Sequence, residues 1–302
     1  MIGVARKEIR LRRRLALAAA ILAVSVLGGL LAVTEASAQE TEWATTELAE
    51  GVFQFSYGAY NTLFVVTDDG VVAFDPISND AARILAQEIR SAAPGVPLLA
   101  IVYSHHHADH ASGAGVLRTI FGGRTLIIGH ENVLAPLLEA ANPSLPPPDV
   151  TFSGRLTLKP GGREVRLVYL GPSHTASMIV GLIPDARIAF AVDFVANDRV
   201  GYRDLGSHQF REFFRALEAL DKLEFERIAF GHGPVGDRDA VKRQIAYYGD
   251  LRDAVQQALD AGWSEDEAAE RISLDKYASW GGYEEWFALN VRGLYRWLAS
   301  ER

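Results

Sequence analysis

The segment that decides the fold is Ser104-His105-His106-His107-Ala108-Asp109-His110, which directly follows the apolar run Leu98–Tyr103. Alternate residues of an extended segment point the same way, so His105 and His107 can converge on one cation. Asp109 and His110 then face a neighbouring cation. Imidazole and carboxylate are ligands that zinc accepts when thiolate is absent. When this segment is taken alone, a histidine-rich surface loop that chelates metal by chance is the alternative interpretation.

Three further residues that can bind metal stand just past the ends of apolar runs. His174 follows residues 165–170, Asp193 follows residues 188–192, and His232 follows residues 228–230. Loops beyond strand ends are where sites are assembled, because the rigid sheet fixes their positions. Alone, Asp193 would be interpreted as a turn residue and His232 as a loop residue, so the prediction depends on the whole set.

The composition restricts the chemistry. The chain has 302 residues, of which 49% are hydrophobic and 23% are charged, and this composition excludes wholesale disorder. The formal net charge is −8, and residues after Ala38 are more acidic still, which argues against a nucleic-acid binder. The absence of cysteine excludes disulfides, thiolate zinc sites, cysteine nucleophiles and iron–sulfur clusters. Any soft-metal chemistry must therefore use histidine and carboxylate groups.

The N-terminal segment has the pattern of a secretory signal peptide over residues 1–38. Basic residues precede the uncharged apolar run Leu15–Leu27, and Ala36-Ser37-Ala38 forms a cleavage pattern. We therefore expect an exported, periplasmic protein with no stable membrane span after cleavage. The alternative is an uncleaved membrane anchor, because Leu15–Val33 carries no charge and reaches spanning length. The Sec and twin-arginine export routes both stay open.

From about Trp43 the sequence alternates strand-like runs with amphipathic stretches. The predicted strands are 52–56, 62–67, 71–75, 98–103, 125–128, 151–152, 156–158, 164–170, 178–183, 187–192 and 225–230. The predicted helices are 79–92, capped by Asn79, and 111–120, 131–140, 210–220, 239–261, 265–272 and 283–298. Strands in two batches, each followed by helices, predict an α/β protein with two sheets face to face and helices outside. We expect a catalytic domain over residues 39–245, with a helical C-terminal extension over residues 246–302 packed on it.

Taken in order, the candidate ligands and their neighbours resemble the metallo-β-lactamase superfamily over roughly residues 48–245. The motifs are His105-x-His107-x-Asp109-His110, Gly171-Pro172-Ser173-His174-Thr175, Asp193 and Gly231-His232-Gly233-Pro234. The resemblance implies an αββα four-layer sandwich with a two-metal site on the sheet edges. It assigns His105, His107 and His174 to a first zinc ion, Asp109, His110 and His232 to a second, and Asp193 to a bridge between them. Iron and manganese are alternatives to the two zinc ions.

An aspartate at position 193 resembles the glyoxalase II, lactonase and general-hydrolase branches. The true β-lactamases of the superfamily have a cysteine there or lack a bridging side chain. The implied activity is that of a dinuclear zinc-dependent hydrolase, in which a metal-bridging hydroxide cleaves an ester, lactone, thioester or amide-like carbonyl bond. Asp109 is expected to orient this nucleophile and pass a proton to the leaving group. The alternatives are a β-lactamase activity, or a periplasmic metal-binding or redox-accessory protein with little turnover.

Other residues carry weaker hypotheses. Asp75 is either a partner of a ligand histidine or a turn cap before a proline. Tyr60, Tyr202 and Phe194 are candidate pocket walls, whereas Trp286 is expected to pack against the core or a partner subunit. We expect a small-molecule substrate and no nucleic acid, and oligomerisation stays open. An open pocket would favour the enzyme, and a pocket sealed by residues 143–148 or by the C-terminal helices would favour the accessory protein.

Overall fold

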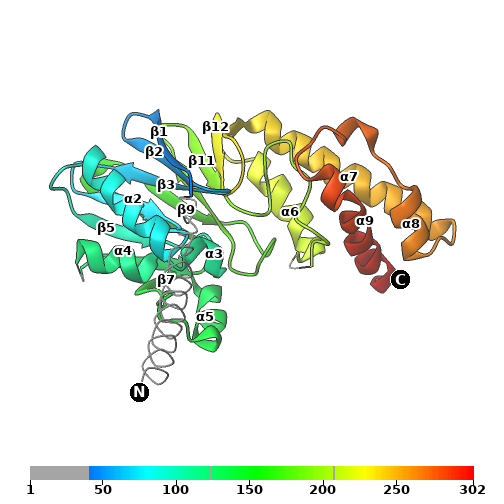
Figure 1. The fold of residues 1–302 in the computed structure, drawn as a ribbon, viewed down its shortest axis with the longest axis horizontal. Helices are drawn as coiled ribbons and strands as arrows, with labels where there is room; N and C mark the ends of the chain where they lie inside the picture. Colours follow the sequence, from blue (N-terminus) through cyan, green and yellow to red (C-terminus); the bar gives the residue numbers. More distant parts are fainter. Residues whose placement is uncertain (1–40, 123, 207) are drawn as a thin grey trace, which may run out of the picture. The chain divides into compact units, whose positions relative to one another are not determined.

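The computed structural model describes residues 41–122, 124–206 and 208–302 (Figure 1). The predicted signal peptide, residues 1–38, lies outside the described residues. Residues 42–302 form one compact unit. Among the described residues, no helix combines the length and apolar character that membrane crossing requires.

The first sheet has seven strands in sequence order. They are β1 (Trp43–Ala49), β2 (Val52–Tyr57), β3 (Tyr60–Val66), β4 (Val71–Phe74), β5 (Leu98–Val102), β6 (Leu126–His130) and β7 (Val150–Phe152). Strands β1 to β4 pair antiparallel, and β4 to β7 pair parallel. The carboxyl ends of β4 and β5 therefore meet at one edge of this sheet.

The second sheet has six strands in the order β13-β12-β11-β10-β9-β8. They are β8 (Arg155–Leu158), β9 (Val165–Tyr169), β10 (Ile179–Ile183), β11 (Ile188–Ala191), β12 (Arg227–Phe230) and β13 (Gly236–Asp237). Strands β9, β11 and β12 run in the same direction, because β10 is antiparallel to both β9 and β11 while β11 and β12 are parallel. Their carboxyl ends consequently share an edge.

Helices cover the outer faces of the two sheets (Figure 1). The α-helices are α2 (Asn79–Ala92), α3 (Ala108–Ala111), α4 (Ala114–Phe121), α5 (Leu134–Ala140), α6 (Phe210–Asp221), α7 (Arg238–Asp260), α8 (Glu265–Arg271) and α9 (Tyr283–Ser300). Short 3-10 turns lie at Glu131–Val133, Pro160–Gly162 and Asp275–Tyr277. Helix α2 begins at the cap Ser78, whose side chain accepts from the Ala81 N–H, so the predicted Asn79 cap is wrong by one residue.

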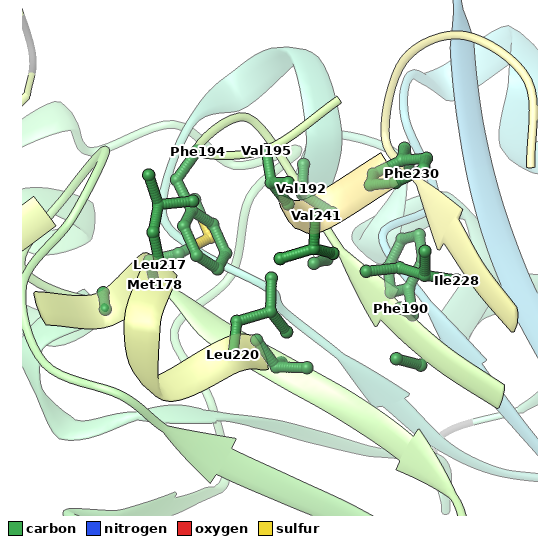
Figure 2. Close-up of a cluster of buried hydrophobic side chains, with 14 of the residues drawn as sticks. Met178, Phe190, Val192, Phe194, Val195, Leu217, Leu220, Ile228, Phe230 and Val241 are labelled. Carbon is green, nitrogen blue, oxygen red and sulfur yellow. The ribbon is translucent and has the colours of Figure 1, made fainter. Parts of the chain in front are cut away.

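Two hydrophobic clusters hold the layers together. One joins the outer face of the first sheet to α2 and α4 through Leu85, Ile89 and Leu117. The other fills the space between the sheets, where the Phe74 and Phe190 ring centroids are 5.2 Å apart, and continues under α6 and α7. Figure 2 shows part of this second cluster, in which side chains of β11, β12, α6 and α7 meet, among them Phe190, Ile228, Phe230, Leu217, Leu220 and Val241.

One strand differs from the sequence-based expectation. Strand β1 was not predicted, because its residues are largely exposed and show no apolar alternation. Helix α7, predicted over residues 239–261, spans Arg238–Asp260, and the division into a catalytic domain and a C-terminal extension stays a prediction. The C-terminal helices therefore continue directly from the second sheet without a linker.

Candidate metal centre and active site

Each candidate ligand is delivered by the carboxyl end of a strand. The segment His105 to His110 follows β5, His174 lies between β9 and β10, Asp193 comes two residues after β11, and His232 comes two residues after β12. These strand ends share edges for the topological reasons given above. The sequence-based prediction that the seven residues lie near one another thus has a direct structural basis.

The rings converge on the carboxylate of Asp193. The Nε2 atoms of His105, His110 and His174 lie 3.3, 3.3 and 3.4 Å from its Oδ2. Nε2 of His232 lies 3.1 Å from Oδ1. Nδ1 of His107 lies 3.0 Å from Nε2 of His174. Two overlapping groups have ligand atoms within 4.8 Å of one another. The first is His105, His107, His174 and Asp193, and the second is His110, Asp193 and His232.

This arrangement fits a cation better than a hydrogen-bond network. One carboxylate oxygen has about two lone pairs, yet three imidazole nitrogens compete for Oδ2 of Asp193. In the described part of the chain, Nε2 of His105 and both ring nitrogens of His110 are buried without a hydrogen bond of good geometry. Cations placed between these rings and the carboxylate would satisfy Nε2 of His105 and Nε2 of His110.

The charge balance points the same way. Among the described residues, Asp75, Asp109 and Asp193 have no lysine or arginine within salt-bridge distance. Burial by itself would lower the pKa of His110, but Asp193, Asp75 and Asp109 outweigh it and raise that pKa to about 9. The three carboxylates thus favour a proton on His110. A divalent cation at this place would neutralise the same carboxylates. Burial lowers the pKa of His105 to about 4, which keeps its ring in the neutral form that binds metals.

Neighbouring groups fix the orientation of two candidate ligands. Nδ1 of His232 lies 2.8 Å from the Ala59 carbonyl oxygen, and because a carbonyl only accepts, Nδ1 carries the proton and Nε2 is left for Asp193 or a metal. Nδ1 of His105 lies 2.9 Å from Oγ of Ser104. The Ser104 N–H donates to Oδ1 of Asp75 at 2.8 Å. Asp75 is fully buried and therefore anchors the start of the ligand segment.

Asp193 and His232 sit on loops with special backbone requirements. Asp193 has a φ of +62°, and the Phe194 N–H donates to the Val192 carbonyl across it, which makes a tight three-residue turn.

The side chain of Asn61, at the start of β3, donates to the carbonyls of Phe230 and Gly233 at 3.1 and 2.8 Å. Asn61 thereby ties the first sheet to the His232 loop. This role could not be predicted from the sequence, because a single asparagine in a strand carries no signal for it.

Asp109 lies at the edge of the centre. Its Oδ2 is 3.8 Å from Nε2 of His110, its side chain is 50% exposed, and it belongs to neither of the two close ligand groups. Burial, followed by the charges of Asp109 and Asp193 and a hydrogen bond to Asp109, raises the pKa of the Tyr60 phenol. The Tyr60 ring packs against His110 and His232, with centroids 5.5 and 4.9 Å away.

A cavity of about 470 Å³ opens onto the centre. Its walls include Tyr60, Asp109, Tyr202, Arg199 and Trp286, together with the ligand candidates His107, His174, Asp193 and His232. A larger groove of about 1040 Å³ on the second sheet contains none of the candidate ligands. The smaller cavity is therefore the candidate active site.

Some pocket predictions need correction. Tyr60 and Tyr202 line the cavity as expected, but Phe194 is 1% exposed and packs in the core cluster. Trp286 packs against the core cluster as expected and also forms part of the cavity wall. Arg199 was missed altogether, because nothing in the sequence places residue 199 beside residue 286. His106 lies outside both ligand groups, and its Nδ1 is 2.9 Å from Oγ of Ser177.

Comparisons with known proteins agree with this picture. The family model for the metallo-beta-lactamase superfamily matches residues 57–232. The chain belongs to this superfamily, and the family and fold-class predictions are confirmed.

Curated relatives are enzymes of moderate similarity. The chain is 31% identical over 160 residues to 2,4-dinitroanisole O-demethylase subunit alpha of Nocardioides sp. (strain JS1661), covering 51% of this chain and 48% of the relative. It is 32% identical over 164 residues to hydroxyacylglutathione hydrolase of Acidiphilium cryptum (strain JF-5), covering 54% of this chain and 61% of the relative. The chain thus spans about half to three-fifths of these relatives.

Among solved structures, the inverting sec-alkylsulfatase Pisa1 from Pseudomonas sp. superposes with a TM-score of 0.69 at 15% sequence identity. The match covers 84% of this chain and 50% of the sulfatase. At this identity the likeness shows a shared fold alone. The expectation of a metal-dependent hydrolase of this fold agrees with the relatives found.

Proposed function

We propose that this chain is a metal-dependent hydrolase that cleaves an ester, lactone, thioester or amide-like carbonyl bond at a two-zinc centre. The observation that carries the proposal is the convergence of four histidine nitrogens on the Asp193 carboxylate at 3.1–3.4 Å. This cluster lies at the base of an open cavity. The proposed ligands are His105, His107 and His174 for one ion, Asp109, His110 and His232 for the other, and Asp193 between them.

Two bound cations would polarise a carbonyl oxygen and lower the pKa of a water molecule towards about 7. The chain supplies positioning and proton transfer. Asp109 is half exposed in the cavity, so it can accept a proton from the attacking water and pass it to the leaving group. The Tyr60 phenol lies near Asp109, whose charge helps to raise the pKa of that phenol.

Among the possible bonds, a thioester is favoured by a curated relative that is named hydroxyacylglutathione hydrolase. The open access to the cavity favours an enzyme rather than an accessory protein with little turnover. Asp109 and His232 are partly exposed, and residues 143–148 do not belong to the cavity wall. Helix α9 contributes a wall through Trp286 and leaves the cavity open.

The proposal is tested by metal analysis of the purified chain together with a panel of lactone, thioester, aryl ester and nitrocefin substrates. We expect about two zinc ions per chain and hydrolysis of a thioester or aryl ester that stops after chelation and returns with zinc. Hydrolysis of nitrocefin in preference to the other substrates would assign the β-lactamase alternative. One iron per chain, or turnover that survives complete metal removal, would contradict the proposal.

Export to the periplasm stays a prediction from residues 1–38. Fractionation of cells that produce the full chain, with N-terminal sequencing of the product, tests it. A mature N-terminus at Gln39 in the periplasmic fraction is expected, and retention of the whole segment in the membrane would assign the anchor alternative.

A further inference from the structure

Arg199 lines the cavity beside the candidate metal centre and stacks on a tryptophan ring. The guanidinium carbon of Arg199 lies 4.8 Å from the centroid of the Trp286 ring, which comes from the C-terminal helix α9. Both residues line the cavity whose wall also includes His174 and Asp193. Arg199 is therefore a cationic group in the same space as the proposed reaction.

The backbone around Arg199 is fixed to the C-terminal helices. The Gln244 side chain donates to the Arg199 carbonyl at 3.2 Å, and the Val200 N–H donates to the Gly281 carbonyl at 3.1 Å. Asn290 of α9 is fully buried and donates to the carbonyls of Gly201 and Arg203 at 2.8 and 2.6 Å. The loop carrying Arg199 thus has a defined place relative to Trp286.

The charge of Arg199 is not matched within the protein. Two arginines near this loop are paired, since Arg243 contacts Asp198 at 2.7 Å and Arg296 contacts Asp204 at 2.7 Å, whereas Arg203 stacks on the Tyr202 ring. Within residues 41–122, 124–206 and 208–302, no carboxylate lies within salt-bridge distance of the Arg199 guanidinium. The guanidinium stacks on the face of Trp286. A guanidinium stacked on an aromatic ring keeps its N–H edge available for a planar or tetrahedral oxyanion.

The cavity wall also carries aromatic residues. Tyr202 packs edge-on against Trp286 with ring centroids 4.9 Å apart, and Tyr60 stands by the metal-ligand candidates. A substrate that reaches from the metal centre to Arg199 would cross this surface, which suits an apolar or aromatic spacer.

We propose that Arg199, held against Trp286, determines substrate specificity by binding an oxyanion of the substrate at a distance from the bond that is cleaved. This proposal rests on the proposed hydrolase activity. The substrate class is an ester or thioester whose far end carries a carboxylate or a sulfonate-type group. The C-terminal extension is then part of the binding site, because Trp286 and Asn290 place the arginine.

The test compares esters that differ only at the far end. The zinc-loaded full chain is assayed with mono-4-nitrophenyl adipate, 4-nitrophenyl 5-sulfopentanoate and the neutral 4-nitrophenyl 6-amino-6-oxohexanoate. We expect kcat/KM to favour one of the two anionic esters over the neutral one by about 10- to 100-fold, as for a hydrogen-bonded charge pair. The preferred anion distinguishes a carboxylate from a sulfonate. Arg199→Ala should reduce the preference to near unity, and Arg199→Lys should leave part of it.

Arg271 provides a matched control. Its guanidinium lies 5.1 Å from the Trp263 ring centroid, which is the same arginine-on-tryptophan contact, and it takes no part in the cavity wall. Arg271→Ala should keep the full preference for the anionic ester. An equal preference in the wild type and in Arg199→Ala, or an equal loss in both alanine variants, would overturn the assignment.

A binding measurement separates this inference from the proposed function. Calorimetric titration of the zinc-loaded chain with 6-phenylhexanoate and 6-phenylhexanamide reports anion recognition without turnover. We expect tighter binding of the carboxylate, with the difference lost in Arg199→Ala and kept in Arg271→Ala. If the wild type hydrolyses no ester, the proposed function fails, while an Arg199-dependent preference in the titration still supports the anion site. A preference that is unchanged in Arg199→Ala overturns the anion site even when esters are hydrolysed.

Discussion

Gly231→Ala should disturb the metal centre through packing alone, without removing any ligand. Gly231 directly precedes His232, and a Cβ added to it would stand 2.5 Å from Cγ1 of Val192 and 3.3 Å from Cε1 of His110. Carbon atoms pack at about 3.5–4.0 Å, so Val192 must move by about 1 Å or more. Because Val192 precedes the tight turn at Asp193, the carboxylate must move with it.

The expected magnitude follows from these contacts. Overpacking of a closely packed core costs about 1–3 kcal/mol, and for a chain of this size each kcal/mol lowers Tm by about 2–4 °C. Metal–ligand distances tolerate only about 0.2 Å, so a shift of Asp193 should weaken metal binding well beyond the loss of stability. We expect loss of at least half of the bound metal after dialysis and a comparable loss of turnover.

The assay combines metal content after dialysis with thermal unfolding of the same preparations. Gly154→Ala is the matched control, because a Cβ there would meet no heavy atom within 4 Å and its φ is outside the left-handed region. The control should keep the metal content and the Tm of the wild type. If Gly231→Ala retained full metal and a Tm within about 1 °C of the wild type, the packing argument for the centre would be refuted.

The remaining predictions concern the proton-transfer group Asp109 and the buried side chain of Asn290. Asp109→Asn should reduce kcat by about 100-fold or more. The free energy of unfolding should change by less than about 0.5 kcal/mol, because the side chain is half exposed. Wild-type rates in steady-state kinetics would refute the role of Asp109. Asn290→Ala should lower the free energy of unfolding by about 2–4 kcal/mol, since it leaves the Gly201 and Arg203 carbonyls and the Tyr247 hydroxyl without their partner. Urea unfolding measures this loss, and a change below about 0.5 kcal/mol would contradict it.

The arrangement of the core elements could be predicted from the sequence because local patterns determine them. Buried runs such as β5 and β11 are almost wholly apolar, and α6 has its apolar residues at helical spacing. The metal-ligand candidates could be named because each follows one of these runs, and six of the seven belong to the two close ligand groups, with Asp109 outside them. Their convergence is then a consequence of strand direction, which the two-sheet topology supplies.

Other features could not be predicted, because they depend on contacts between distant parts of the chain. β1 pairs with β2 through backbone hydrogen bonds while its side chains stay exposed, so it leaves no apolar pattern. The stacking of Arg199 on Trp286 joins a loop of the second sheet to the last helix. Phe194 was expected as a candidate pocket wall, but the turn at Asp193 sends the two side chains in different directions, that of Asp193 to the centre and that of Phe194 to the core.

The metal content of Asp193→Asn, set beside that of Asp198→Asn, tests the central claim most directly. Both aspartates have positive φ values, +62° and +47°, in the same loop, and asparagine tolerates this conformation, so the two substitutions place the same demand on the backbone. Asp198 contacts Arg243 and lies outside the candidate ligand groups. We predict that Asp193→Asn loses most of its bound metal after dialysis, whereas Asp198→Asn keeps the wild-type amount. Equal metal content in the two variants would contradict the account of a metal centre assembled around Asp193.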